Sequence, residues 1–243
     1  MKRLFTKKWV MCILSLVMCF SYLSMKACAF AGKTHQYTTQ RGIEILDSVL
    51  GEKYKEFYSD KDREQILKYC TKPDEDETAG AFKYHFYNPA TEKNFMDEDD
   101  SALARCKNHY QNAINLFNND RREDAFEELG RSLHFLEDLN TPVHTNNQSF
   151  IDTTYNVSFH VSFENKCKDI QSRVVSSLLK SEFRYYKNNT IENIAKACAF
   201  LANDNFYALY KKTLPRETVA ANSIKNAQKS VAGVLYKFYL DVN

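Results

Sequence analysis

Two imidazoles and a carboxylate stand within eleven residues of this chain, at His134, Asp138 and His144. On a helix, His134 and Asp138 share one face because they are four positions apart, about 6 Å along the axis. Pro142 predicts the end of that helix, since the residue before a proline is driven out of the α region. The turn then carries His144 back toward the same end. Because imidazole and carboxylate ligands suit zinc, the segment predicts a metal site.

The same imidazole–carboxylate spacing recurs at His160 and Glu164. Each pair alone could be an ordinary ion pair within a helix, worth about a few tenths of a kcal/mol. Together with His144, however, the two pairs offer more ligands than one tetrahedral zinc requires. The pattern therefore favours a centre with more than one metal ion.

A long polar connection is expected over residues 71–100, where acidic residues are frequent. Loops of this length in compact domains are usually functional or disordered. His85 stands in it among four aromatic residues, and such a cluster is normally buried. We therefore expect His85 to be ordered and to have a partner inside the fold.

The first 29 residues are predicted to be a signal peptide. Basic residues precede an apolar stretch at residues 10–23, which is too short to span a bilayer comfortably. Ala27 and Ala29 provide a small-residue cleavage site, and a second candidate site lies two residues further on. A retained signal anchor is the alternative. We expect a secreted protein whose mature part begins at or just after Phe30.

Removal of this leader changes the charge balance. The chain has 33 Lys plus Arg and 31 Asp plus Glu, and residues 1–29 contain five of the basic residues and no acidic ones. Residues 30–243 therefore carry 28 basic and 31 acidic residues, a net charge of −3. They lack the basic surplus that is typical of nucleic-acid-binding domains, so nucleic acid is not an expected partner.

The remaining 214 residues are enough for one domain with a substantial core. Six Gly and four Pro are too few for a turn-rich β sandwich, and apolar residues recur at helical spacing. We predict an all-α fold, a single compact multi-helix bundle over residues 30–243. The expected helices are residues 35–50 with Thr34 as the cap, 54–70, 101–118, 121–139, 156–179, 190–212 and 217–240.

Four cysteines follow the leader, at Cys70, Cys106, Cys167 and Cys198. They show no CxxC spacing, which excludes a zinc ribbon. An even number in an exported protein could form two disulfides, but buried free thiols remain an equal alternative.

Residues 134–147 resemble the signature of the bacterial zinc-dependent phospholipases C. This family includes the Bacillus phosphatidylcholine-preferring enzyme and the catalytic domain of clostridial alpha-toxin. The similarity covers nearly the whole mature chain in the family's order. Its further stretches are Thr34 and His35, residues 72–74, residues 84–89, residues 159–165 and residues 231–238. The stretches around His134 and His160 are specific, whereas those around His35 and Asp74 are short local matches.

This resemblance implies three zinc ions held by three sets of ligands. They are Asp74, His85, His134 and Asp138 for the first ion, His144, His160 and Glu164 with water for the second, and His35 and Asp138 for the third. Asp138 would thus bridge two ions. In the family, an N-terminal tryptophan well upstream of the first histidine completes the third site through its α-amine and carbonyl. Here Phe30 would take that place, only five residues before His35. His109 has no counterpart and is interpreted as a residue of a helix surface.

The resemblance also implies hydrolysis of phosphatidylcholine-like glycerophospholipids to diacylglycerol and a phosphorylated headgroup. Clustered zinc ions can neutralise a phosphodiester and generate its nucleophile at neutral pH. Asp74 is the candidate catalytic residue, which would orient or deprotonate the attacking water, although a role as ligand alone explains it equally well. Phe82 and Glu75 match positions near the headgroup, and an aromatic face with a carboxylate suits a quaternary ammonium. The alternative is that Phe82 belongs to the core and Glu75 is solvated.

We therefore expect a monomeric enzyme that acts at a phospholipid membrane surface. A separate C-terminal lipid-binding domain like that of alpha-toxin is not expected. A zinc-dependent single-strand nuclease is the first alternative, because such nucleases share this metal arrangement, but the slightly acidic mature charge weighs against it. A non-catalytic zinc-binding surface protein is the second alternative, and the short N-terminal arm keeps it open.

Overall fold

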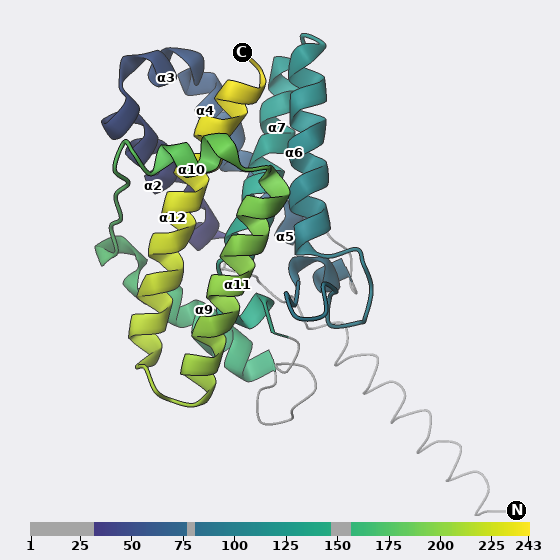
Figure 1. Cartoon of the computed structure of the whole chain (residues 1–243), viewed down its shortest axis with the longest axis vertical. Helices are drawn as coiled ribbons and strands as arrows, with labels where there is room; N and C mark the ends of the chain where they lie inside the picture. The colour runs from purple at the N-terminus through teal and green to yellow at the C-terminus, as the bar shows by residue number, and fades with distance from the viewer. Residues whose placement is uncertain (1–31, 77–80, 147–156) are drawn as a thin grey trace, which may run out of the picture.

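Helices make up nearly all regular structure in residues 32–76, 81–146 and 157–243, which are the residues that the computed structural model describes (Figure 1). The α-helices are α2 (Lys33–Leu50), α3 (Glu52–Phe57), α4 (Asp60–Tyr69), α5 (Lys72–Asp76), α6 (Ala102–Asn118), α7 (Arg122–Asp138), α9 (Val157–Ile170), α10 (Phe183–Asn188), α11 (Ile191–Tyr210) and α12 (Arg216–Asp241). Short 3-10 helices are η1 (Ala81–His85), η2 (Pro142–His144) and η4 (Gln171–Arg173). The predicted all-α fold is confirmed.

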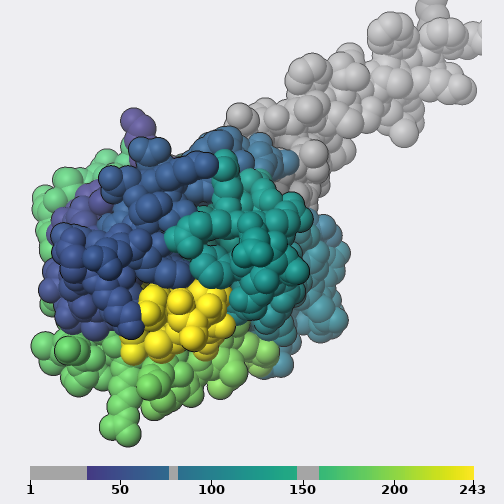
Figure 2. All heavy atoms as spheres, turned by 90° about the horizontal axis from the view of Figure 1, so that it is seen from above, coloured from purple at the N-terminus to yellow at the C-terminus, as the bar shows by residue number. Residues whose placement is uncertain are grey.

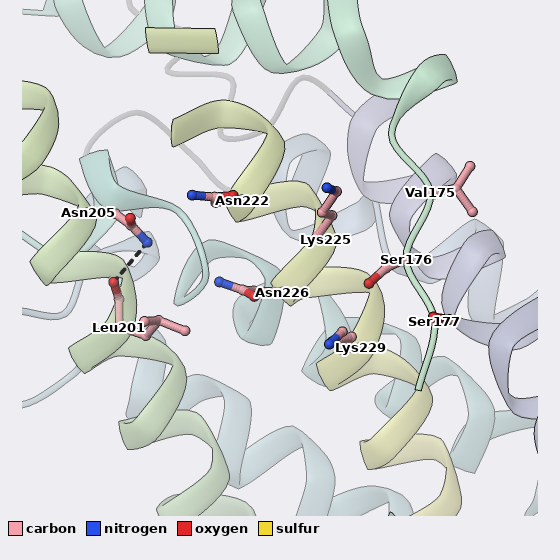
Figure 3. A pocket seen from close by; sticks show the side chains of 9 residues that line it. All are labelled: Val175, Ser176, Ser177, Leu201, Asn205, Asn222, Lys225, Asn226 and Lys229. Atoms are coloured by element: carbon pink, nitrogen blue, oxygen red, sulfur yellow. Dashed lines mark hydrogen bonds between the residues drawn. The ribbon is translucent and has the colours of Figure 1, made fainter. Parts of the chain in front are cut away.

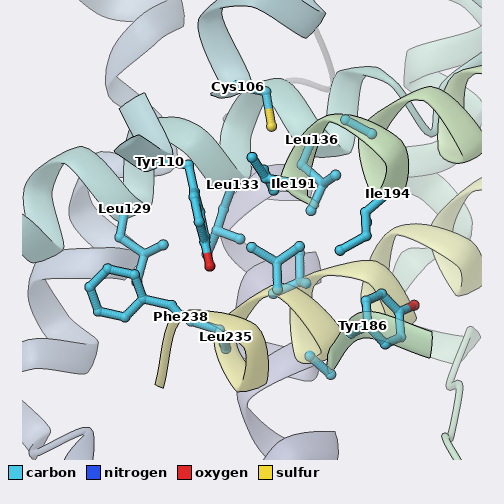
Figure 4. Close-up of a cluster of buried hydrophobic side chains, with 14 of the residues drawn as sticks. Cys106, Tyr110, Leu129, Leu133, Leu136, Tyr186, Ile191, Ile194, Leu235 and Phe238 are labelled. Atoms are coloured by element: carbon cyan, nitrogen blue, oxygen red, sulfur yellow. The ribbon is translucent and has the colours of Figure 1, made fainter. Parts of the chain in front are cut away.

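The core forms where α6, α7, α11 and α12 meet. Figure 4 shows side chains of these helices, Tyr110, Leu133, Ile194 and Leu235 among them, converging in one apolar cluster. α12 is buried on most of its circumference, as expected for a helix whose apolar residues are not confined to one stripe. In Figure 2, the C-terminal end of α12 reaches the surface between the N-terminal helices and the α6–α7 pair. Among the described residues, no helix combines the length and the apolar character that crossing a bilayer requires.

The four cysteines of the described chain are free thiols. Cys70, Cys106 and Cys167 are buried, and Cys198 is half-buried. Burial raises the pKa of the Cys106 thiol to about 12 and that of Cys198 to about 11. These thiols are therefore poor nucleophiles and act as small apolar residues of the core.

One helix was predicted over residues 54–70, and the structure has two. Ser59 separates α3 from α4 by a capping box: its N–H donates to the Asp62 carboxylate at 2.9 Å, and its Oγ accepts from the Asp62 N–H at 3.4 Å. These bonds satisfy backbone donors that a continuous helix would have used internally. The expected cap at Thr34 was also wrong, because α2 begins at Lys33 and Thr34 is fully buried inside it.

The predicted helix over residues 156–179 was too long. α9 ends at Ile170, and after η4 the chain has no regular structure until α10, which was not predicted. After α9 and η4, the buried side chain of Gln228 in α12 takes the place of the backbone hydrogen bonds that a longer helix would have made. Its Oε1 accepts from the Ser176 N–H at 2.9 Å, and its Nε2 donates to the Val174 carbonyl at 3.0 Å. This partner comes from a distant part of the chain, so local periodicity could not predict the helix end.

The contact between α4 and α7 requires a glycine at position 130. A Cβ there would lie 2.7 Å from the Ile66 carbonyl oxygen and 3.2 Å from the Cys70 nitrogen, both backbone atoms. We expect Gly130→Ala to lower the free energy of unfolding by about 1–3 kcal/mol, because neither atom can move alone. Urea denaturation would measure this, with Gly32→Ala as the control, since its Cβ would meet only Thr71 atoms at 3.7 Å. Equal stability of the two variants would contradict the close helix contact.

Candidate metal centre

The eight described residues predicted as ligands converge at one place, although they come from six elements. They are His35 of α2, Asp74 of α5, His85 of η1, His134 and Asp138 of α7, His144 of η2, and His160 and Glu164 of α9. Seven of these side chains are at most 4% exposed, and that of Asp74 is 8% exposed. Phe30, the ninth predicted ligand, lies outside the described residues, as does the leader that precedes it.

The end of α7 has the geometry that its sequence predicts. His134 and Asp138 share one face, with Nε2 and Oδ2 3.4 Å apart. The helix ends at Asp138, Thr141 is extended before Pro142, and η2 then returns the chain. As a result, the His144 Nε2 lies 3.9 Å from the Asp138 Oδ1.

Asp138 is the central carboxylate of the cluster. Besides His134 and His144, it faces the His85 Nδ1 at 2.8 Å and the His35 Nε2 at 3.6 Å. Burial opposes ionisation of this carboxyl, but the neighbouring His144 and His134 hold its pKa well below the usual value. A permanently ionised carboxylate among four imidazoles is suited to bind cations on both of its oxygens.

A second group of donors adjoins the first on α9. The Glu164 Oε1 lies 2.7 Å from the His160 Nε2 and 3.1 Å from the His144 Nε2. Burial opposes ionisation of Glu164 as well, and its pKa is nevertheless lowered by His160 and His144. The ring of Phe86 packs against both imidazoles, with centroids 4.7 Å from His144 and 5.6 Å from His160. The ligand atoms of His144, His160 and Glu164 lie within 4.8 Å of one another, close enough to share one ion.

Contacts behind the cluster orient three of its imidazoles. The Nδ1 of His134 lies 2.9 Å from the Cys70 carbonyl oxygen, and that of His144 lies 2.9 Å from the His85 carbonyl oxygen. Donation from Nδ1 to these carbonyls leaves each Nε2 as the ligand atom toward the centre, which is how proteins usually fix a metal-binding histidine. The third, His35, has a carboxylate behind it, that of Glu137.

Glu137, which is fully buried, was not predicted as part of the site. A glutamate between Leu136 and Asp138 reads as an ordinary helix residue. A signal was nevertheless present, since position 137 follows the buried Leu133 and Gly130 by four and seven residues. At 3.6 residues per turn these positions share one face, so a helical projection would have placed Glu137 inside.

Two observations indicate that the imidazole and carboxylate groups of the cluster suit a metal ion. Both carboxylate oxygens of Asp74 and the Oδ1 of Asp138 are buried without a hydrogen-bond partner among the described residues, which is costly unless a cation compensates. The Asp74 Oδ1 lies 3.6 Å from the His134 Nε2 and 3.8 Å from the His85 Nδ1, too far for hydrogen bonds. Two ligands of one tetrahedral zinc, each about 2.1 Å from the ion, are about 3.4 Å apart. The spacing therefore suits zinc.

We expect zinc affinity to fall as the pH drops below about 7. Burial raises the pKa of Asp74 to about 7, so below that pH the carboxyl holds a proton that zinc must displace. This group should weaken zinc binding by up to about tenfold per pH unit between pH 7 and pH 5. Competition with a chelator at several pH values would measure the slope. Asp74→Asn is the control, and an unchanged slope in that variant would contradict the assignment to Asp74.

The two predicted substrate-binding residues differ in how they relate to this centre. Phe82 is half-buried and stacks on Phe95 with centroids 5.3 Å apart. Phe95 in turn meets Phe86 edge to face at 5.1 Å, so aromatic rings link Phe82 to the imidazole of His144. Glu75 is exposed and pairs with Lys72 at 2.5 Å, beside a surface pocket of about 660 Å³. Glu75 therefore lies outside the buried cluster.

A further pocket and the sixth histidine also lie away from the cluster. The pocket, of about 480 Å³, lies between α11, α12 and residues 175–177, and its lining contains no imidazole or carboxylate (Figure 3). His109 is half-buried, and its Nδ1 lies 2.9 Å from the Glu128 Oε2. Neither feature can contribute a ligand to the metal centre.

Comparison with known proteins agrees with this geometry. The family model for zinc dependent phospholipase C matches residues 34–224, which contain all eight donors. A phospholipase C from Clostridium novyi is 25% identical over 252 residues, 90% of this chain and 63% of that protein. One from Bacillus cereus is 33% identical over 84 residues, 35% of this chain and 29% of that protein. The chain thus spans about 63% of the length of the Clostridium novyi relative.

The fold is that of a solved toxin structure. The alpha toxin from Clostridium absonum aligns with a TM-score of 0.76 and 24% identity over 86% of this chain and 64% of that one. The residues that the family model matches include the buried imidazole–carboxylate cluster. This chain therefore belongs to the zinc-dependent phospholipase C family.

Proposed function

We propose that this protein is a zinc-dependent phosphodiesterase that hydrolyses phosphatidylcholine-like glycerophospholipids to diacylglycerol and a phosphorylated headgroup. The observation that carries the proposal is the convergence of eight buried imidazole and carboxylate side chains in a chain of this family. A phosphodiester carries negative charge and resists attack by water. A cluster of cations held by such donors compensates that charge.

Three groups of ligands are proposed, and the close spacing of His85, His134 and Asp138 and of His144, His160 and Glu164 supports the first two. Asp74, His85, His134 and Asp138 would hold the first zinc, and His144, His160 and Glu164 would hold the second. His35 and Asp138 would hold the third together with the mature N-terminal residue, which we assign to Phe30. When bound, these ions supply Lewis-acid stabilisation of the phosphate and a water of lowered pKa. The protein's part is to fix the imidazoles, through the carbonyls of Cys70 and His85, so that each donor faces the centre.

Asp74 is our candidate for the residue that accepts a proton from the attacking water. Its side chain is 8% exposed, the largest fraction among the eight, and both of its carboxylate oxygens are buried toward the centre without a hydrogen-bond partner among the described residues. It is held on the short helix α5 within 4 Å of His85 and His134, which fixes its orientation. A positioned carboxylate of this kind contributes about 10²–10⁴-fold to a rate.

The substrate would enter at the aromatic edge of the centre. An aromatic face such as that of Phe82 attracts a quaternary ammonium, and the carboxylate of Glu75 would add charge complementarity if it exchanged its pairing with Lys72 for the headgroup. We propose a secreted monomer that takes its substrate from a phospholipid surface and does not use nucleic acid.

The test compares two substrates with the purified, zinc-loaded chain. We expect phosphocholine release from phosphatidylcholine vesicles, abolished by a chelator and by His144→Ala. His109→Ala is the matched control, because His109 lies outside the cluster and should leave the release unchanged. Nucleotide release from single-stranded nucleic acid alone would replace this proposal with a nuclease. Bound zinc without either activity would indicate a non-catalytic zinc-binding protein.

A further inference from the structure

Glu137 is a buried carboxyl that no ligand group uses. Its Oε2 lies 2.5 Å from the His35 Nδ1, and its Oε1 accepts a hydrogen bond from the Thr39 Oγ1 at 2.8 Å. His35 and Thr39 are one turn apart on α2, so that helix presents two partners to the same carboxyl group. Both carboxyl oxygens are therefore engaged, and the plane of the group is fixed against the imidazole edge.

The opposite edge of the same imidazole faces the centre. The His35 Nε2 lies 3.6 Å from the Asp138 Oδ1, while its ring stacks on that of His134 with centroids 4.0 Å apart. The His35 ring thus stands between two carboxylates that are adjacent in α7, Glu137 on its Nδ1 side and Asp138 on its Nε2 side. This order of carboxylate, histidine and ligand position is the arrangement that fixes the tautomer of metal-binding histidines.

A purely structural role explains this contact poorly. Glu137 is fully buried, so a carboxylate at this place loses the hydration that it would have at the surface. An apolar side chain of similar volume would join α2 to α7 at no such cost. The other two oriented imidazoles, those of His134 and His144, use backbone carbonyls, which require no buried acid. The carboxylate is thus specific to the His35 position.

We propose that Glu137 is a positioning residue that holds His35 with its proton on Nδ1 and directs its Nε2 toward the metal ion shared with Asp138. A carboxylate behind the ring also makes Nε2 a stronger donor than a carbonyl would. A stronger donor matters at the third proposed metal position, to which the described residues His35 and Asp138 are assigned. The inference rests on the metal binding that the proposed function requires.

The experiment measures zinc affinity in the full chain by stepwise competition with a chelator and metal analysis. In Glu137→Leu, we expect the weakest-bound zinc to dissociate at about 10–100-fold higher free-zinc concentration, while the remaining zinc is unaffected. In Glu137→Gln, which keeps an acceptor but loses the charge, we expect about a tenfold change. Glu128→Leu is the matched control, because Glu128 also faces a histidine Nδ1 from α7, but outside the cluster.

A double-mutant cycle separates positioning from a general loss of structure. If Glu137 acts through His35, then Glu137→Leu should cause no further loss of zinc in a His35→Ala background. Unchanged zinc affinity in Glu137→Leu, or an additive loss in the double variant, would overturn the proposal. If Glu137→Leu does not fold, Glu137→Gln tests the proposal instead. Unchanged zinc affinity in that variant, or an additive loss of zinc when it is combined with His35→Ala, would then overturn it. Because the readout is bound zinc, a chain that binds zinc but hydrolyses no phosphodiester would refute the proposed function and leave this inference intact.

Discussion

Asp138→Asn is expected to remove more zinc than His35→Ala and to lower phosphodiester hydrolysis by about 10⁴-fold, or about 5.5 kcal/mol. Asp138 lies within 4 Å of four imidazoles and belongs to two of the proposed ligand groups, whereas His35 belongs to one. Loss of the charge should therefore weaken two metal positions, and loss of His35 only one. Metal analysis of both purified variants, followed by assay at saturating zinc, measures the difference.

The control for this prediction is a buried aspartate elsewhere. Asp62 is 7% exposed at its side chain and pairs with Arg122, and neither residue is a proposed ligand. Breaking a buried pair costs stability, so Asp62→Asn should lower the unfolding free energy but leave the zinc content unchanged. Equal zinc content in Asp138→Asn and His35→Ala would refute the bridging role of Asp138.

Asp74→Asn is expected to lower the rate of hydrolysis by about 10²–10⁴-fold even when zinc is saturating. The amide keeps the shape of the side chain and one oxygen donor, but it cannot accept a proton from water. Added zinc should restore occupancy without restoring the rate. Turnover measured across a zinc titration would separate the two effects.

Asp76→Asn is the matched control on the same short helix. Asp76 is exposed and pairs with Arg131, so its replacement should leave zinc binding and hydrolysis unchanged. Recovery of the full rate by Asp74→Asn at high zinc would show that Asp74 is a ligand only. That outcome would remove the proton-accepting role and keep the metal centre.

Much of the site follows from local spacing. The pairs His134/Asp138 and His160/Glu164 depend only on the helical repeat, and the return of His144 depends only on the proline that ends α7. The long helices were predictable for the same reason, since an apolar stripe repeats wherever a helix is buried on one face. Errors occurred where a side chain replaced a backbone bond, at Ser59 and at Gln228.

The two substrate-binding candidates show the limit of such reasoning. Phe82 and Glu75 were chosen by position in short matched stretches. The structure connects Phe82 to the centre through Phe95 and Phe86, but it pairs Glu75 with Lys72 at the surface. Their proposed roles therefore depend on tertiary contacts that the spacing of residues in the sequence does not predict.

The sequence alone determined which donors this protein has and which of them share a helix face, because both follow from residue type and a fixed helical repeat. Only the tertiary structure decided that Asp138 faces four imidazoles and that Glu137 stands behind His35. The place of Glu137 depends on the packing of α2 against α7, about a hundred residues apart in sequence, and the contacts of Asp138 depend on η1 as well as on α2. Burial of a charged side chain is set by what packs over it, and that partner is chosen by the whole fold.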